Sequence, residues 1–167
     1  HESQRERTRS MARSRLFWLG LFGILCAGAA EVTLAQWSSA YAQVVLGFSQ
    51  VVADGLGFGL FGVMMIAGRL WYGLRGHNVR LRPLLISGGA LAALCYVAMA
   101  LSPWPAVSLA ACALAGLFVS LLWPGIVSLS AAAFPRAGIS LFALLAAFGD
   151  TGAGLGPWLV GLTADSV

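Results

Sequence analysis

Residues Pro83–Pro135 read PLLISGGALAALCYVAMALSPWPAVSLAACALAGLFVSLLWPGIVSLSAAAFP, and these 53 residues decide the fold because they include no Asp, Glu, Lys, Arg or His. As a single helix they would be about 80 Å long, whereas the hydrocarbon core of a bilayer is about 30 Å thick. The breaker segment Ser102–Pro105 stands near the middle, where a turn is needed. The stretch therefore predicts two membrane-spanning helices joined by a turn.

Three further apolar windows of about 20 residues, the length that crosses a bilayer, lie on either side of this stretch. Only 10% of the residues are charged and 59% are hydrophobic, whereas a soluble domain carries about 25% charged residues. The sequence thus predicts an all-α membrane protein, a bundle of five transmembrane helices with the lipid bilayer as its surroundings. The predicted spans follow an arginine-rich segment, 1–15, and cover about residues 16–41, 52–72, 84–101, 106–129 and 139–161.

Several other classes of protein are excluded by the same residues. The net charge of +4 comes from arginines in short clusters beside apolar runs, so no basic face is available for nucleic acid. Cys26, Cys95 and Cys112 lie inside apolar runs without ligand spacing, so we expect packing residues and no metal site. No cofactor-binding motif is present. Ser87 stands beside two glycines but has no histidine within reach, so we expect no enzyme.

The arginines predict the orientation of the chain, because cytoplasmic loops carry an excess of Lys and Arg. They place the N-terminus in the cytoplasm and the C-terminal end outside. The membrane would be a plasma membrane, with a bacterial inner membrane favoured. A cleavable signal peptide starting at Met11 is a competing interpretation, which the membrane character of all later residues disfavours. The ten arginines precede the first span (Arg5, Arg7, Arg9, Arg13, Arg15), follow the second (Arg69, Arg75, Arg80, Arg82) or follow the fourth (Arg136).

Two acidic residues are predicted near the middle of spans. Glu31 lies about 22 Å along the first span and Asp150 about 16 Å along the fifth. A charged residue at such a depth costs roughly 2.5 to 3.5 kcal/mol and normally faces a bundle interior or a water-filled cavity. Either acid therefore marks a substrate or proton site, or else a packing seam. An apolar environment favours the protonated carboxyl group, so we expect protons as a possible coupling partner.

Helix breakers inside spans give a second signal. Pro124-Gly125 is predicted to kink the fourth span and Gly156-Pro157 the fifth, because each proline frees a backbone carbonyl that must find another partner. Kinked spans beside a cavity are common in transporters. Gly152 and Gly156 also form a GxxxG pair, which allows close helix packing.

The segment GRLWYGLRGHNVRLRP, Gly68–Pro83, resembles the cytoplasmic loop of the major facilitator superfamily. It lacks the acid of the strongest form of that motif, which favours the C-terminal half of the fold. AEVTLAQWSSAY at Ala30–Tyr41 and FPRAGISLFALLAAFGDTGAGLGPWLVG at Phe134–Gly161 resemble the seventh span and the eleventh-span region of fucose-permease-like sugar transporters. The resemblance implies that residues 1–15 are a cytoplasmic linker and that residues 16–167 are spans seven to eleven.

The resemblance also implies a function. The protein would be a permease that carries out secondary active transport of a small polar solute, with a sugar favoured and a symporter as the type. Its partners would be that solute, the other half of the transporter and its last helix. Gly68, Arg69 and Arg75 would act at the cytoplasmic gate. The predicted substrate-binding or coupling residues are Glu31, Gln36, Trp37 and Trp123, with Asp150 less favoured.

Two alternatives remain open. Gly152, Gly156, Pro157 and Gly161 partly match an antiporter motif, so the chain could instead be the N-terminal half of a drug/proton antiporter. A non-transporting membrane assembly or scaffold subunit is the other. An internal echo favours two repeated units, as in transporters built from inverted repeats: Cys26, Ala27, Ala29 and Trp37 recur at a constant offset as Cys112, Ala113, Ala115 and Trp123.

Overall fold

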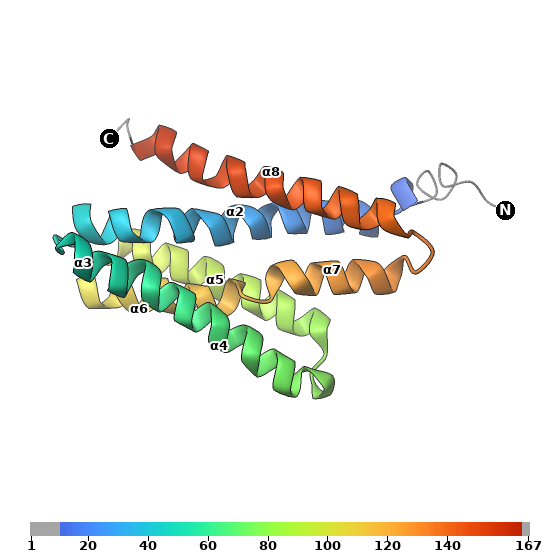
Figure 1. Ribbon diagram of the computed structural model, residues 1–167, viewed down its shortest axis with the longest axis horizontal. Helices are drawn as coiled ribbons and strands as arrows, with labels where there is room; N and C mark the ends of the chain where they lie inside the picture. Colours follow the sequence, from blue (N-terminus) through green and yellow to red (C-terminus); the bar gives the residue numbers. More distant parts are fainter. Residues whose placement is uncertain (1–10, 165–167) are drawn as a thin grey trace.

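The computed structural model describes residues 11–164, which form helices joined by short turns and include no strand (Figure 1). Arg5, Arg7 and Arg9 of the predicted linker lie outside the described residues. The elements are α2 (Arg15–Val44), α3 (Gln50–Ala53), the π-helix η1 (Asp54–Gly59), α4 (Leu60–Arg75), the 3-10 helix η2 (Gly76–Asn78), α5 (Leu81–Leu101), α6 (Pro105–Val119), α7 (Leu122–Ala133) and α8 (Ile139–Ala164).

Five helical segments are long and apolar enough to cross a membrane, as predicted: Arg15–Val44, Gln50–Asn78, Leu81–Leu101, Pro105–Ala133 and Ile139–Thr163. Their boundaries differ from the predicted ones by up to six residues, the largest difference being the end of the second segment at Asn78, because a helix continues its backbone hydrogen bonds into polar flanks. Between 17% and 39% of the most apolar window of each segment is buried. The remaining surface presents Leu, Val, Ile, Phe and Trp side chains outward, which suits contact with lipid rather than water.

The helices form two parallel pairs. α2 and α8 run side by side in the same direction, and α4 and α6 do the same, while α5 packs against α6 and α7 (Figure 1). The fourth segment, α6 with α7, is the most buried, and α5 is the least buried. One core cluster joins α2, α4, α5 and α6 around Phe61 and Val119, and a second joins α2 and α8 around Leu21 and Leu145.

Close backbone approach between α2 and α8 depends on glycine. A Cβ atom added at Gly152 would overlap the Leu25 carbonyl, and one added at Gly28 would overlap the Gly149 carbonyl. At Gly156 the added atom would lie 2.8 Å from the Ala29 carbonyl oxygen. The small residues predicted to allow close packing thus do so against α2.

The internal sequence repeat, which matches Cys26 with Cys112, also relates whole helices to one another. Its offset of 86 residues carries α2 onto residues 101–130, which cover most of α6 and α7, and carries residues 50–75 onto 136–161, within a few residues of α8. The parallel pairs α2/α8 and α4/α6 are equivalent under this offset. α2 and α6 run in opposite directions (Figure 1), so the two units are inverted relative to each other.

The two predicted kinks have different outcomes. The fourth span is interrupted at Ser120–Leu121, between α6 and α7, rather than at Pro124-Gly125 itself. Because a proline ring clashes with the carbonyl four residues before it, the break falls at Ser120. α8 continues through Pro157 as one helix, so Gly156-Pro157 does not divide the fifth span in two.

Candidate functional site

An ion pair joins the first two spans. Nη2 of Arg69 on α4 lies 2.9 Å from Oε1 of Glu31 on α2. Arg69 lies inside α4, six residues before its last residue, Arg75. This agrees with the predicted span of about 52–72, so counting Arg69 among the arginines that follow the second span is wrong. The helix continues past Arg69 because Leu70, Trp71 and Tyr72 keep it apolar and aromatic and Glu31 compensates the charge.

Arg69 has a second partner that Pro124 makes available. Nε of Arg69 donates to the backbone carbonyl of Ser120, with a distance of 3.1 Å. In an unbroken helix that carbonyl would accept from the amide of residue 124, but proline has no N–H. The Ser120 carbonyl freed by Pro124 therefore accepts a hydrogen bond from the Arg69 guanidinium. The sequence predicts that this carbonyl needs another partner, but it does not identify the partner.

Gly68 brings α4 close enough to α6 for this contact. A Cβ atom at Gly68 would overlap the Ser120 hydroxyl and would lie 3.0 Å from the Leu117 carbonyl oxygen. The Ser120 hydroxyl itself donates to Leu117 O at 2.6 Å. Gly68 was predicted as part of a gate, and the structure places it as the packing residue beside Arg69.

The exposure of the pair restricts what can surround it. The Arg69 side chain is 48% exposed and that of Glu31 is 21% exposed. Glu31 lies 16 residues after the start of α2, or about 24 Å along it. A guanidinium half open at a membrane-spanning level is costly in hydrocarbon. This face of α2 and α4 is therefore one that meets water or another polar surface, not lipid.

Tyr96 and Ser120 complete the polar contacts of this region, and the sequence did not single them out. The Tyr96 hydroxyl on α5 donates to the Ala30 carbonyl on α2 at 2.6 Å, next to Glu31 in the chain. For Ser120 a signal was available, because it lies four residues before Pro124. For Tyr96 no sequence signal separates it from an aromatic packing residue.

Gln36 and Trp37 lie away from the ion pair, in a cavity of about 480 Å³ between α2 and α8. Trp158 of α8 is the other large side chain in its lining. The Trp37 indole Nε1 donates to the Pro157 carbonyl at 3.2 Å, which fixes the ring at the edge of this cavity. Gln36 is exposed, so its amide is open to a ligand.

The other predicted site residues do not join the ion pair. Trp123 of α7 packs against the crossing of α2 and α8, where its ring lies close to Gly28 and Gly149. Asp150 is exposed on α8, and none of the hydrogen bonds found among residues 11–164 involves it. Arg75 is exposed at the end of α4.

Replacing Pro124 with alanine tests the link between the helix break and Arg69. The new amide is expected to donate to the Ser120 carbonyl, join α6 to α7 and displace the Arg69 guanidinium. Hydrogen–deuterium exchange of peptides covering residues 118–126 should then slow at least severalfold. Pro105→Ala is the matched control, because proline at the first residue of a helix removes no hydrogen bond. Unchanged exchange in Pro124→Ala would contradict the link.

Among residues 11–164, no group of three or more His, Cys, Asp or Glu side chains is arranged to hold a metal ion. The polar centre of the bundle is the Glu31–Arg69 pair with the Ser120 carbonyl. Comparison with family models, curated proteins and solved structures finds no match to this chain.

Proposed function

We propose that this chain is part of a membrane transporter, of the major facilitator type, that moves a small polar solute by secondary transport. The observation that carries the proposal is the Glu31–Arg69 pair with its half-exposed guanidinium. Intramembrane charged residues mark substrate and ion pathways. A pair used only to join two helices would not need to leave the cation open.

The helix break supports the same function. Discontinuous helices with free backbone carbonyls line the binding sites of many transporters. The break between α6 and α7 presents one such carbonyl, at Ser120, directly to Arg69. A rearrangement of α7 relative to α6 would therefore change the surroundings of the ion pair, which is a route for coupling the pair to movement.

The cavity between α2 and α8 favours a sugar-like solute. Its volume of about 480 Å³ lies within the 300 to 1,000 Å³ range typical of small-molecule sites, which combine aromatic walls with a few polar groups. Trp37 and Trp158 supply indole faces and Gln36 supplies an amide. A polyol ring suits that combination, since its C–H face packs on an aromatic ring while its hydroxyl groups bind the amide.

The proposed location is a plasma membrane, and the proposed orientation places the N-terminus in the cytoplasm. Within the described residues, the arginines other than Arg69 stand at the end of the bundle where α2 begins: Arg13, Arg15, Arg75, Arg80, Arg82 and Arg136. The cytoplasmic side is the one that retains Lys and Arg. Arg75 and Gly68 would then lie toward the cytoplasmic gate.

Reconstitution of the complete gene product tests the function. Proteoliposomes would be loaded with buffer and given a panel of labelled sugars, amino acids and drugs, with and without a proton gradient. We expect saturable uptake of a sugar or another small neutral polar solute, reduced at least tenfold by Arg69→Gln. Folded protein that moves none of these solutes would contradict the proposal and favour an assembly or scaffold subunit. Exchange of a drug for protons would instead support the antiporter alternative.

A further inference from the structure

The outer end of the second span is wound as a π-helix. η1 connects α3 to α4, and it is the only π-helix among residues 11–164. A π-helix bonds each amide to the carbonyl five residues earlier, so it holds one residue more than an α-helix along the same path. The amide of Leu60, which follows η1, donates to the Gly55 carbonyl in this way. Such segments occur mostly as single turns inside α-helices, frequently at functional sites.

Glycines make this segment easy to rearrange. η1 contains three of them, and only Gly57 is required by packing, because a Cβ atom there would lie 2.7 Å from the Ser38 carbonyl oxygen. A Cβ atom at Gly55 would meet nothing within 4 Å, and one at Gly59 would meet only the Asp54 carbonyl oxygen, at 3.4 Å. Glycine stabilises a helix less than alanine does. The two glycines that packing does not require therefore keep the helical hydrogen bonds of η1 weak.

A polar contact with α2 holds η1 in its present winding, here called the π register. The Ser39 hydroxyl donates to the exposed carboxylate of Asp54, the first residue of η1, and the Gln43 amide donates to the Ser39 hydroxyl at 3.2 Å. If the extra residue left η1, the short outer end would move rather than α4, which packs along α6. Each residue of that end would take the place of the residue before it, a rotation of about 100° and a shift of about 1.5 Å. Asp54 would then leave Ser39.

The place that Asp54 would enter, now occupied by Ala53, has an unused hydrogen-bond donor beside it. Cys112 Sγ on α6 lies 4.0 Å from the Gly57 carbonyl oxygen of η1. The second span and α6 run in the same direction, so Ala53 and Ser108, each four residues earlier, face one another about one turn further out. Both residues are 0% exposed. The Ser108 hydroxyl has no hydrogen-bond partner among the residues that the structure describes.

We propose that the outer end of the second span switches between two registers. The Asp54 carboxyl group accepts from Ser39 in the π register and from Ser108 in the α register, in which η1 has become α-helix. The Ser108 hydroxyl offsets part of the cost of burying the carboxyl group. Ala53 takes the place of Val52, which is 41% exposed, and so leaves the core. The switch does not depend on the transport function; in a transporter it would reshape the outer end of the path beside α2.

Cysteine labelling of the complete gene product in intact membranes tests the switch. Ala53→Cys would be the single cysteine, and a charged, impermeant methanethiosulfonate reagent would be added outside. We expect Ser39→Ala, which removes the partner of the π register, to speed labelling of position 53 at least about tenfold, because water then reaches the thiol. Adding Ser108→Ala should return the rate to that of the parent. Deletion of Gly55, which removes the extra residue from η1, should also keep position 53 protected.

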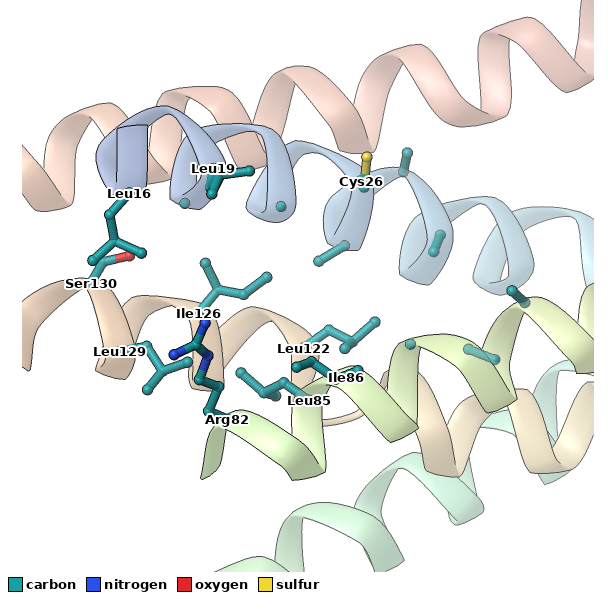
Figure 2. A pocket seen from close by; sticks show the side chains of 18 of the residues that line it. Leu16, Leu19, Cys26, Arg82, Leu85, Ile86, Leu122, Ile126, Leu129 and Ser130 are labelled. Atoms are coloured by element: carbon teal, nitrogen blue, oxygen red, sulfur yellow. The ribbon is translucent and has the colours of Figure 1, made fainter. Parts of the chain in front are cut away.

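Cys26, retained as the single cysteine in a parallel set of variants, is the control for general loosening of the bundle. It lies on α2 along an open apolar groove of about 840 Å³ between α2, α5 and α7 (Figure 2), which a charged reagent does not enter. Its labelling should stay slow in every variant.

Three results would overturn the proposal. They are slow labelling of position 53 in the Ser39→Ala variant, fast labelling there that Ser108→Ala does not reverse, and a parallel rise in the labelling of Cys26. Ser108→Ala removes only an unpartnered hydroxyl, so we expect this variant to fold. Because no readout involves solute uptake, a negative result here leaves the transport proposal intact, and a negative transport assay leaves the switch intact.

Discussion

Replacing Gly152 with alanine is expected to lower the free energy of unfolding by about 1 to 3 kcal/mol, the usual cost of overpacking a close contact. The added methyl group would overlap the Leu25 backbone carbonyl, and a backbone atom cannot move aside as a flexible side chain can. α2 and α8 would have to separate, which would loosen the core around Leu21, Leu141 and Leu145. Thermal unfolding of the detergent-solubilised protein measures the change.

Gly154→Ala is the matched control for that variant. It lies two residues further along α8, and a Cβ atom there would meet nothing within 4 Å. Both substitutions gain helix propensity, worth up to about 1 kcal/mol, so this gain cancels in the comparison. We expect Gly154→Ala to be neutral or slightly stabilising. Equal stability of the two variants would contradict the close contact of α2 with α8.

Breaking the Glu31–Arg69 pair is expected to have the largest effect on function. Glu31→Gln leaves the guanidinium without a counter-charge, and Arg69→Gln leaves the carboxylate alone. A hydrogen bond to a charged group contributes about 1.5 to 3 kcal/mol, so each single variant should lose roughly 10-fold to 100-fold in transport rate. Uptake of the labelled solute in proteoliposomes measures this loss.

The double variant Glu31→Gln/Arg69→Gln distinguishes the effect of losing the ion pair from the effect of losing either residue alone. Removing one partner leaves an uncompensated charge, whereas removing both leaves none, so we expect the double variant to unfold at a higher temperature than either single variant. Arg80→Gln, at an exposed position just before α5, should change neither stability nor transport comparably. Additive losses in the double variant would show that the two residues act independently.

The spans are predictable from this sequence because the bilayer imposes one simple requirement. An apolar segment must be about 20 residues long and bounded by polar or helix-breaking residues, and the Ser102–Pro105 turn and the arginine clusters satisfy it visibly. The free carbonyl in the fourth span is also predictable from the sequence, since Pro124 has no N–H to donate to the carbonyl of Ser120. At Pro157 the same rule allows a kink without a break, and α8 continues through it as one helix.

The candidate site is less predictable because it is made by tertiary contacts. Glu31 stands out as an acid inside an apolar run, but its partner is 38 residues away and was counted among the arginines that follow the second span. The signal that Arg69 lies inside a helix is the apolar and aromatic run that continues past it to Tyr72. Trp123 and Trp37 look alike in sequence, and only the fold shows which of them packs at a helix crossing and which lines a cavity.

The central claim is that the face of α4 carrying Arg69 meets water inside the membrane. Gly62 lies on that face, seven residues or two helical turns before Arg69, and a Cβ atom there would meet nothing within 4 Å. Leu94 lies on the outer side of α5, 63% exposed. Both residues are 13 positions from the ends of their helices near the α4–α5 turn, about 20 Å deep.

The most direct measurement compares Gly62→Cys with Leu94→Cys in protein whose three native cysteines have been replaced. A charged, membrane-impermeant methanethiosulfonate reagent reacts with the thiolate, which forms where water reaches the side chain. The account predicts rapid modification at position 62 and none at position 94 in intact membranes. Protection of position 62 as complete as that of position 94 would contradict it.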